Sequence, residues 1–212
     1  MAEPYKFADA AIRQINRYAL RIADKTKSKL TILGFDELNV LKLTDALYAD
    51  LNVYTRLKYM DLYIKRYLEV LASLGVEKPD DDTIDELVEM FMTGFLDKPN
   101  PVTNYAYSTE SLRKRDRAKE AILSLQTKSA KQLMLVKHLR YYLQMAQWYA
   151  DFASQDAEIQ ALKDAGVKRV KRHEMEDEKT CPVCKAADGE IYDIDKIPPL
   201  PHPRCRRWFT RA

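Results

Sequence analysis

The 212-residue sequence lacks the features that mark secreted and membrane-embedded proteins. It contains no run of about 18 apolar residues, the length that a membrane-spanning helix requires. Charged residues such as Lys6, Asp9 and Arg13 interrupt its first segment, so we expect neither a signal peptide nor a membrane span. Three cysteines, an odd number, without a secretion signal favour a reducing compartment over a disulfide framework.

Glycine is also scarce, with five residues, whereas leucine, alanine, lysine, glutamate and tyrosine are abundant. This composition favours helices over turn-rich β structure. The hydrophobic share of 46% is ordinary for a folded protein and allows a sizeable core. The net charge of +3 is too small to indicate a nucleic-acid partner by itself.

Apolar residues recur at helical spacing through most of the first 164 residues. We predict long helices over about 36–73 and 129–164, and shorter ones over about 5–28, 82–96 and 110–125. Asp36, and Ser108 or Thr109, are suitable N-caps for two of them. A helix of about 36 residues is on the order of 50 Å long. Two such rods predict an elongated, hairpin-like bundle.

The sequence changes character after Gly166, which is a suitable end for the last long helix. Residues 167–173 alternate loosely and can form a strand, with residues 189–194 as its partner. Four prolines between positions 198 and 203 exclude a helix there. We therefore predict a mainly α protein with two parts: a helical body, residues 1–165, and a small Cys/His-rich tail, residues 166–212, resembling a β-hairpin.

Charge is unevenly distributed along the body. Residues 77–89 carry seven acidic side chains against one lysine, and residues 113–140 carry nine basic side chains against two acidic ones. Such segregation indicates docking to a neighbouring subunit or contact with a polyanion, although a solvated helix face gives the same pattern. The candidate contacts to a partner or to nucleic acid are Arg113, Lys114, Arg115, Arg117 and Lys119.

All three cysteines and one of the three histidines fall within 25 residues of the tail. The pattern is Cys181-Pro-Val-Cys184, seventeen residues, then His202-Pro-Arg-Cys205. Tetrahedral zinc is held by thiolate and imidazole ligands that arrive as two close pairs. We therefore predict a structural zinc site made by Cys181, Cys184, His202 and Cys205. Cysteines that only pack in reduced form, and a redox Cys-x-x-Cys pair, are the alternatives.

A tail of this size cannot bury enough apolar surface to fold alone, so a metal or a larger partner must help. Structural zinc supplies about 10 kcal/mol or more in small peptides, which is sufficient. Four protein ligands leave no open position for a substrate. His173, beside Glu174, is an alternative ligand, and we interpret His138 as a packed or solvated histidine.

The tail motif resembles a known family. Thr180-Cys-Pro-Val-Cys184, Gly189, Pro198-Pro199 and His202-Pro-Arg-Cys205-Arg206 are similar to the C-terminal signature of phage Mu F-like minor head proteins, also called head-morphogenesis proteins. The stretch from Asn100-Pro101 to Arg117 is similar to the segment that precedes their long helix, so the resemblance covers about residues 99–207. The family often has a second cysteine where this chain has Arg207, which leaves one complete four-ligand set.

The resemblance implies a non-enzymatic minor component of the phage head, made in the bacterial cytoplasm and present in multiple copies per virion. Its partners would be the portal protein or the major capsid protein, and its role would be head assembly or genome delivery. An alternative is a head protein that contacts packaged DNA. A third is a zinc-dependent nuclease, with a base among Glu174, Glu176, Asp177 and Glu178. No Ser-His-Asp set, phosphate loop or His-Glu-x-x-His motif supports an enzyme.

Overall fold

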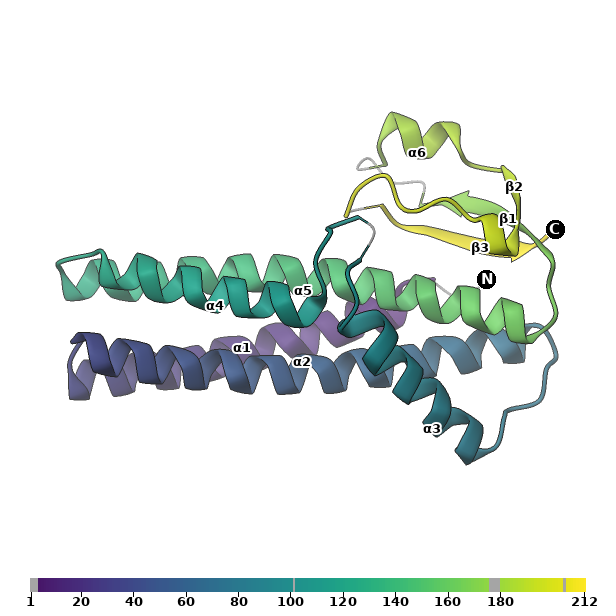
Figure 1. Ribbon diagram of the computed structural model, residues 1–212. Helices are drawn as coiled ribbons and strands as arrows, with labels where there is room; N and C mark the ends of the chain where they lie inside the picture. The colour runs from purple at the N-terminus through teal and green to yellow at the C-terminus, as the bar shows by residue number, and fades with distance from the viewer. Residues whose placement is uncertain (1–3, 101, 176–179, 204) are drawn as a thin grey trace.

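The computed structural model describes residues 4–100, 102–175, 180–203 and 205–212. Four long helices form an elongated bundle, and a small antiparallel sheet with short helical turns lies against one end of it (Figure 1). The four helices are α1 (Lys6–Leu33), α2 (Glu37–Ser73), α4 (Tyr107–Leu123) and α5 (Lys128–Asp164). The predicted fold class, mainly α with a small Cys/His-rich tail, is confirmed. No described helix combines the length and the apolar character needed to cross a membrane.

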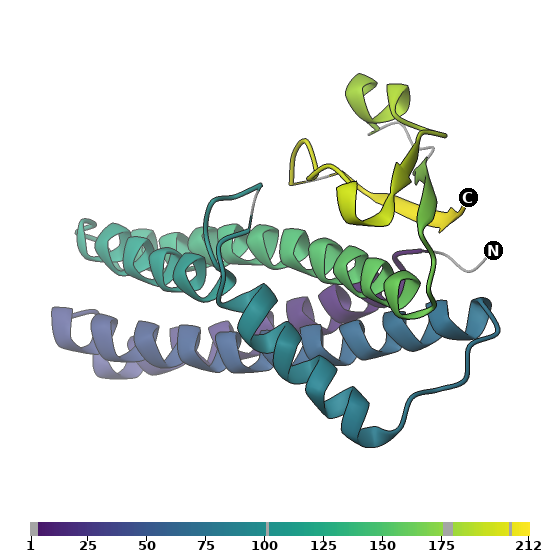
Figure 2. The ribbon, with the colours of Figure 1, turned by 45° about the vertical axis from the view of Figure 1, so that its right-hand side comes forward.

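The bundle consists of two helical hairpins packed side by side. The turn between α1 and α2 and the turn between α4 and α5 lie together at one end, and the tail lies at the opposite end (Figures 1 and 2). Helix α5 packs against α1, α2 and α4. Its last turns reach the sheet, because α5 also contacts strand β3 (Arg207–Arg211). The long helices therefore set the position of the tail.

The helical stripes read from the sequence face the core. The spacing predicts apolar stripes through Ile15 on α1 and Tyr142 on α5, and both residues are buried. On α2 the same spacing predicts that Leu57 faces the core, and this prediction is wrong, since Leu57 is 51% exposed. Four fully buried tyrosines fill the centre, and their hydroxyls are hydrogen-bonded; Tyr107 and Tyr142, for example, share a bond of 2.8 Å. These tyrosines are Tyr59, Tyr107, Tyr142 and Tyr149.

The predicted helix starts are confirmed in one case and wrong in another. The Asp36 carboxylate accepts a hydrogen bond from the Asn39 N–H at 2.9 Å and caps α2 as expected. Helix α4 begins earlier than predicted, at Tyr107, and neither Ser108 nor Thr109 caps it. The helix already begins at the buried Tyr107, so Ser108 lies within its first turn. The Ser108 hydroxyl instead lies in a cluster with Asp97 and Arg56.

The acidic segment forms α3 (Asp81–Met90), which projects from the bundle in both views (Figures 1 and 2). We predicted one α-helix to residue 96, but the chain continues from α3 as a π-helix, η1 (Phe91–Leu96). The wider turn lets Phe91 and Phe95 stack with ring centroids 5.0 Å apart, and it buries both Phe91 and Leu96. Packing of these aromatic residues explains the change of helix type.

The tail contains a three-stranded sheet in the order β2-β1-β3, with both pairs antiparallel. Strands β1 (Arg169–Glu174) and β2 (Ile191–Asp193) match the predicted pair. Strand β3 (Arg207–Arg211) was not predicted. Its inward residues are Arg207 and Phe209, so a buried arginine hides the period-two pattern of apolar side chains. The turns α6 (Pro182–Ala186) and η2 (Ile194–Lys196) complete the tail.

Hydrogen bonds join the tail to the body. The Tyr5 hydroxyl donates to the Arg207 carbonyl at 2.7 Å and accepts from the Gln155 amide at 2.8 Å. The Phe209 N–H donates to the Glu158 carboxylate of α5 at 3.3 Å. The division of the chain into two parts at residue 165 stays a prediction. The hydrogen bonds show that the tail packs against the helical body.

The buried Glu158 makes stability depend on pH. Burial raises the pKa of this carboxyl from 4.5 to about 7, against the opposing effect of Arg66. The folded protein therefore keeps a proton that the unfolded chain releases above about pH 4.5, and stability falls as pH rises from there towards 7. We expect a loss of roughly 3 kcal/mol across this window in urea unfolding. Glu158→Gln should reduce the slope without removing it, because burial also raises the pKa of Asp151, to about 6; an unchanged slope in this variant would contradict the assignment.

Candidate metal centre

The first ligand pair lies on one tight helical turn. Cys181 is the N-cap of α6, and its sulfur accepts a hydrogen bond from the Cys184 N–H at 3.4 Å. Pro182 occupies the first helical position, where its missing N–H costs nothing. The chain leaves this turn through Gly189, whose φ of 81° lies in the left-handed region that glycine adopts readily. The Cys-Pro-Val-Cys sequence thus directs two sulfurs to one side.

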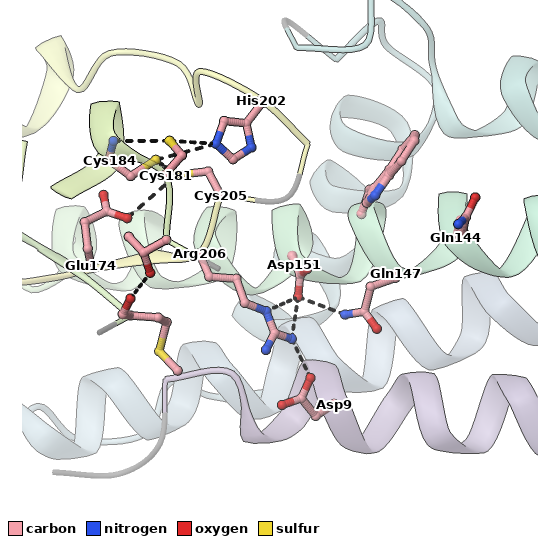
Figure 3. A pocket seen from close by; sticks show the side chains of 13 residues that line it. Asp9, Gln144, Gln147, Asp151, Glu174, Cys181, Cys184, His202, Cys205 and Arg206 are labelled. Atoms are coloured by element: carbon pink, nitrogen blue, oxygen red, sulfur yellow. Dashed lines mark hydrogen bonds and ion pairs between the residues drawn. The ribbon is translucent and has the colours of Figure 1, made fainter. Parts of the chain in front are cut away.

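The second pair comes from the segment before β3. The His202 Nε2 atom lies 3.2 Å from the Cys181 sulfur and 3.7 Å from the Cys184 sulfur. The Cys205 sulfur lies 2.9 Å from that of Cys184. All four predicted ligands therefore gather at one place, as Figure 3 shows.

Two groups of three ligand atoms share Cys184. The ligand atoms of Cys181, Cys184 and His202 lie within 4.8 Å of one another, and so do those of Glu174, Cys184 and Cys205. Two ligands on one zinc ion are separated by about 3.5–3.8 Å. The separations from His202 are close to this range, and the Cys184–Cys205 pair is tighter. The cluster of thiols and imidazole can hold a metal ion.

Glu174 is a neighbour of the centre that the sequence suggested only as a possible base. It is buried, and its carboxylate accepts a hydrogen bond from the Cys205 thiol at 3.8 Å. The Arg172 guanidinium binds the same carboxylate at 2.5 Å and lies 4.0 Å from the Cys205 sulfur. Because Glu174 is already neutralised by an arginine, it is poorly suited to hold a cation. The alternation along β1 places Arg172 and Glu174 on one face, but charged side chains rarely mark a buried face.

The three cysteine thiols differ in the direction in which their surroundings shift the pKa. Hydrogen bonds from the Cys184 N–H and from His202 lower the pKa of Cys181 to about 7. Burial raises the pKa of Cys184 and also that of Cys205. A thiol must lose its proton to ligate a metal, so ion binding has to offset the burial of these two sulfurs.

The centre forms one wall of a pocket of 570 Å³ between the tail and the bundle. The opposite wall includes Trp148, Gln147 and Asp151 of α5 and Asp9 of α1. Arg206 spans the gap: its guanidinium binds Asp151 at 2.9 Å and also pairs with Asp9 (Figure 3). Burial raises the pKa of Asp151 to about 6. The residue after the last ligand thus ties the metal centre to α1 and α5.

Neither of the other histidines lies at the cluster. The ring of His173 stacks on Trp208 with centroids 5.3 Å apart, and its Nε2 atom hydrogen-bonds the Thr210 hydroxyl at 2.8 Å. His138 lies on α5 beside Tyr141, as expected for a packed histidine. The possible bases Glu176, Asp177 and Glu178 fall outside the described residues.

Four of the five basic residues proposed as partner contacts are engaged in ion pairs on α4. Arg113 and Lys114 pair with Glu110 of the same helix. Arg115 and Lys119 pair with Asp45 of α2 and with Asp116. Of the five, Arg117 alone is exposed. The structure therefore leaves this segment with little free positive charge.

No protein-family model, curated protein or solved structure matches the chain. Three sulfurs and one imidazole nitrogen are the donors that zinc prefers in structural sites. Calcium and magnesium prefer oxygen donors and fit the cluster poorly.

Proposed function

We propose that this chain is a minor head protein of a bacteriophage, acting in head morphogenesis rather than as an enzyme. It would dock at the portal vertex or the inner capsid, be made in the bacterial cytoplasm and become part of the virion. One observation carries the proposal: the four Cys and His residues of the head-protein-like signature, which come as two pairs within 25 residues of the chain, meet in one cluster on the end of a long helical bundle. This arrangement suits a rigid assembly component.

The proposed metal is zinc, bound by Cys181, Cys184, His202 and Cys205. A zinc ion would supply structural cross-linking between α6 and the segment that leads into β3. With four protein ligands, no position is open for a substrate, which favours an architectural role over a nuclease.

The proposed docking surface is the bundle end opposite the tail. Exposed apolar side chains gather near the two helical turns there, with Ile32 82% exposed and Leu38 73% exposed. Hydrogen bonds from Lys131 to the Phe35 carbonyl and from Gln132 to Thr31 hold the two turns together. Exposed apolar side chains gathered at one end of a molecule are characteristic of protein–protein contacts. Its members are Ile32, Leu33, Leu38 and Leu133.

Pull-down with the portal and major capsid proteins of the same phage tests the proposal. We expect the chain to retain portal protein, and Ile32→Asp with Leu38→Asp to reduce retention at least tenfold, because charge cannot be buried cheaply in an apolar contact. Leu20→Asp, at a 55% exposed position on the body, is the matched control and should bind normally. Failure of the wild-type chain to bind either protein would overturn the head-assembly role.

A further inference from the structure

Helix α1 presents a row of basic side chains on its outer face. Arg13, Arg17, Arg21, Lys25 and Lys29 follow at intervals of four residues, and all five are exposed. We call these five residues the α1 basic row. At 1.5 Å per residue the row is about 24 Å long. Asp24 is the single acidic residue between its ends.

The charge of this row is not neutralised within the described part of the chain. No ion pair joins any of its five members to a described carboxylate, and the Arg17 side chain donates only to the Arg13 carbonyl of its own helix. The contrast with α4 is direct, because there Arg113, Lys114, Arg115 and Lys119 are paired. The exposed arginines are therefore available to an external anion.

Two stacked tyrosine rings lie beside the row, and we call this pair the tyrosine floor. The rings of Tyr18 and Tyr54 stack with centroids 4.0 Å apart and planes 7° from parallel. Together with Gln14, Arg17 and Arg21 they line a hollow of 280 Å³. The Arg21 guanidinium lies 5.2 Å from the centre of the Tyr18 ring, which holds its charge at the rim of the hollow.

We propose that the α1 basic row is a nucleic-acid-binding face that holds the phosphates of duplex DNA. Guanidinium groups bind phosphate oxygens bidentately, and a row of them along one helix can follow a strand of the backbone. The tyrosine floor fits the sugar–phosphate edge between two arginines. This inference does not depend on the head-assembly role.

The acidic helix α3 of a second copy is the competing occupant. Its ten residues are about 15 Å long, which covers only part of the row. Length therefore favours a long polyanion over α3, and the two occupants predict different experimental results.

Fluorescence anisotropy with a labelled duplex of mixed sequence tests the proposal. We expect wild-type protein to bind at low salt and to lose affinity steeply between about 50 and 200 mM salt. The triple variant Arg13→Gln, Arg17→Gln, Arg21→Gln should bind at least about tenfold more weakly at low salt, and the slope of log K against log salt should fall by roughly 3.

The charge-matched control removes three positive charges from α4: Arg115→Gln, Arg117→Gln, Lys119→Gln. Arg115 and Lys119 form ion pairs with the half-exposed Asp45 at the surface of the bundle, and surface ion pairs contribute little to stability. This variant should therefore fold, as checked by circular dichroism, and bind DNA within about twofold of wild type. No binding by wild-type protein at low salt, or equal weakening by both triples, would overturn the proposal. So would self-association, seen by sedimentation, that is abolished by the α1 triple and by Asp81→Asn, Asp82→Asn, Asp85→Asn while DNA is not bound.

Discussion

Replacement of Cys184 by serine is expected to release the metal and unfold the tail while leaving the bundle helical. Cys184 belongs to both groups of ligand atoms, so its loss disrupts every combination of donors in the cluster. Structural zinc contributes about 10 kcal/mol or more to small domains, and the tail is too small to replace that with apolar burial. We expect hydrogen exchange in β1 and β3 to accelerate at least about 100-fold, or roughly 3 kcal/mol.

His173→Ala is the matched control for this experiment. His173 lies on β1 in the same tail, but its ring stacks on Trp208 and does not face the cluster. The variant should keep its metal and should lose far less exchange protection than Cys184→Ser, because it removes only one pair of side chains between β1 and β3. If Cys184→Ser kept the slow exchange of the wild-type tail, the tail would owe its stability to contacts with α5 instead of a metal.

The second large effect is expected at the buried ion pair between α2 and α5. Arg66 is 6% exposed and Glu158 is 3% exposed; their side chains are paired, and Arg66 also binds Glu69 at 2.7 Å. Arg66→Met leaves the Glu158 carboxylate buried without its cation. Removing one partner of a buried pair costs about 3–5 kcal/mol, and we expect a loss of that order in urea unfolding at about pH 8, above the pKa of about 7 that Glu158 has in the folded protein.

Combining Arg66→Met with Glu158→Gln should restore most of the lost stability. The glutamine carbonyl can still accept the Phe209 N–H, which bonds Glu158 at 3.3 Å in the native protein, and no buried charge remains. A double variant as unstable as Arg66→Met would mean that Arg66 stabilises the protein by packing and not by charge. Thermal and urea unfolding distinguish these results.

Much of the fold was predictable because the long helices repeat one simple pattern. Tyr142 and the other apolar residues of the α5 stripe recur every three or four residues. An apolar stripe of this kind is expected to be buried, whichever helices pack against it. Asp36 was recognised as an N-cap because its chemistry is local. Strand β3 and the π-helix were missed, since Arg207 is buried by a tertiary contact with the Pro198 carbonyl and Phe91 by packing on Tyr63.

The candidate site was also predictable only in part. Spacing identified Cys181, Cys184, His202 and Cys205, because metal ligands in small sites come as close pairs. It could not identify Arg206 as the link to Asp151, a residue 55 positions away, because that contact depends on how the tail lies on α5. The partner contacts proposed on α4 were argued from charge alone, and charge in a sequence does not reveal which arginines are already paired.

The most direct test of the account is the metal content and coordination of the purified chain. Elemental analysis should find one zinc per chain, and X-ray absorption at the zinc edge should find three sulfur ligands and one nitrogen, with no oxygen. Cys205→Ser should replace one sulfur by oxygen or lose the metal. An absence of metal in protein purified without chelators, or an oxygen ligand in the wild type, would contradict a closed structural site.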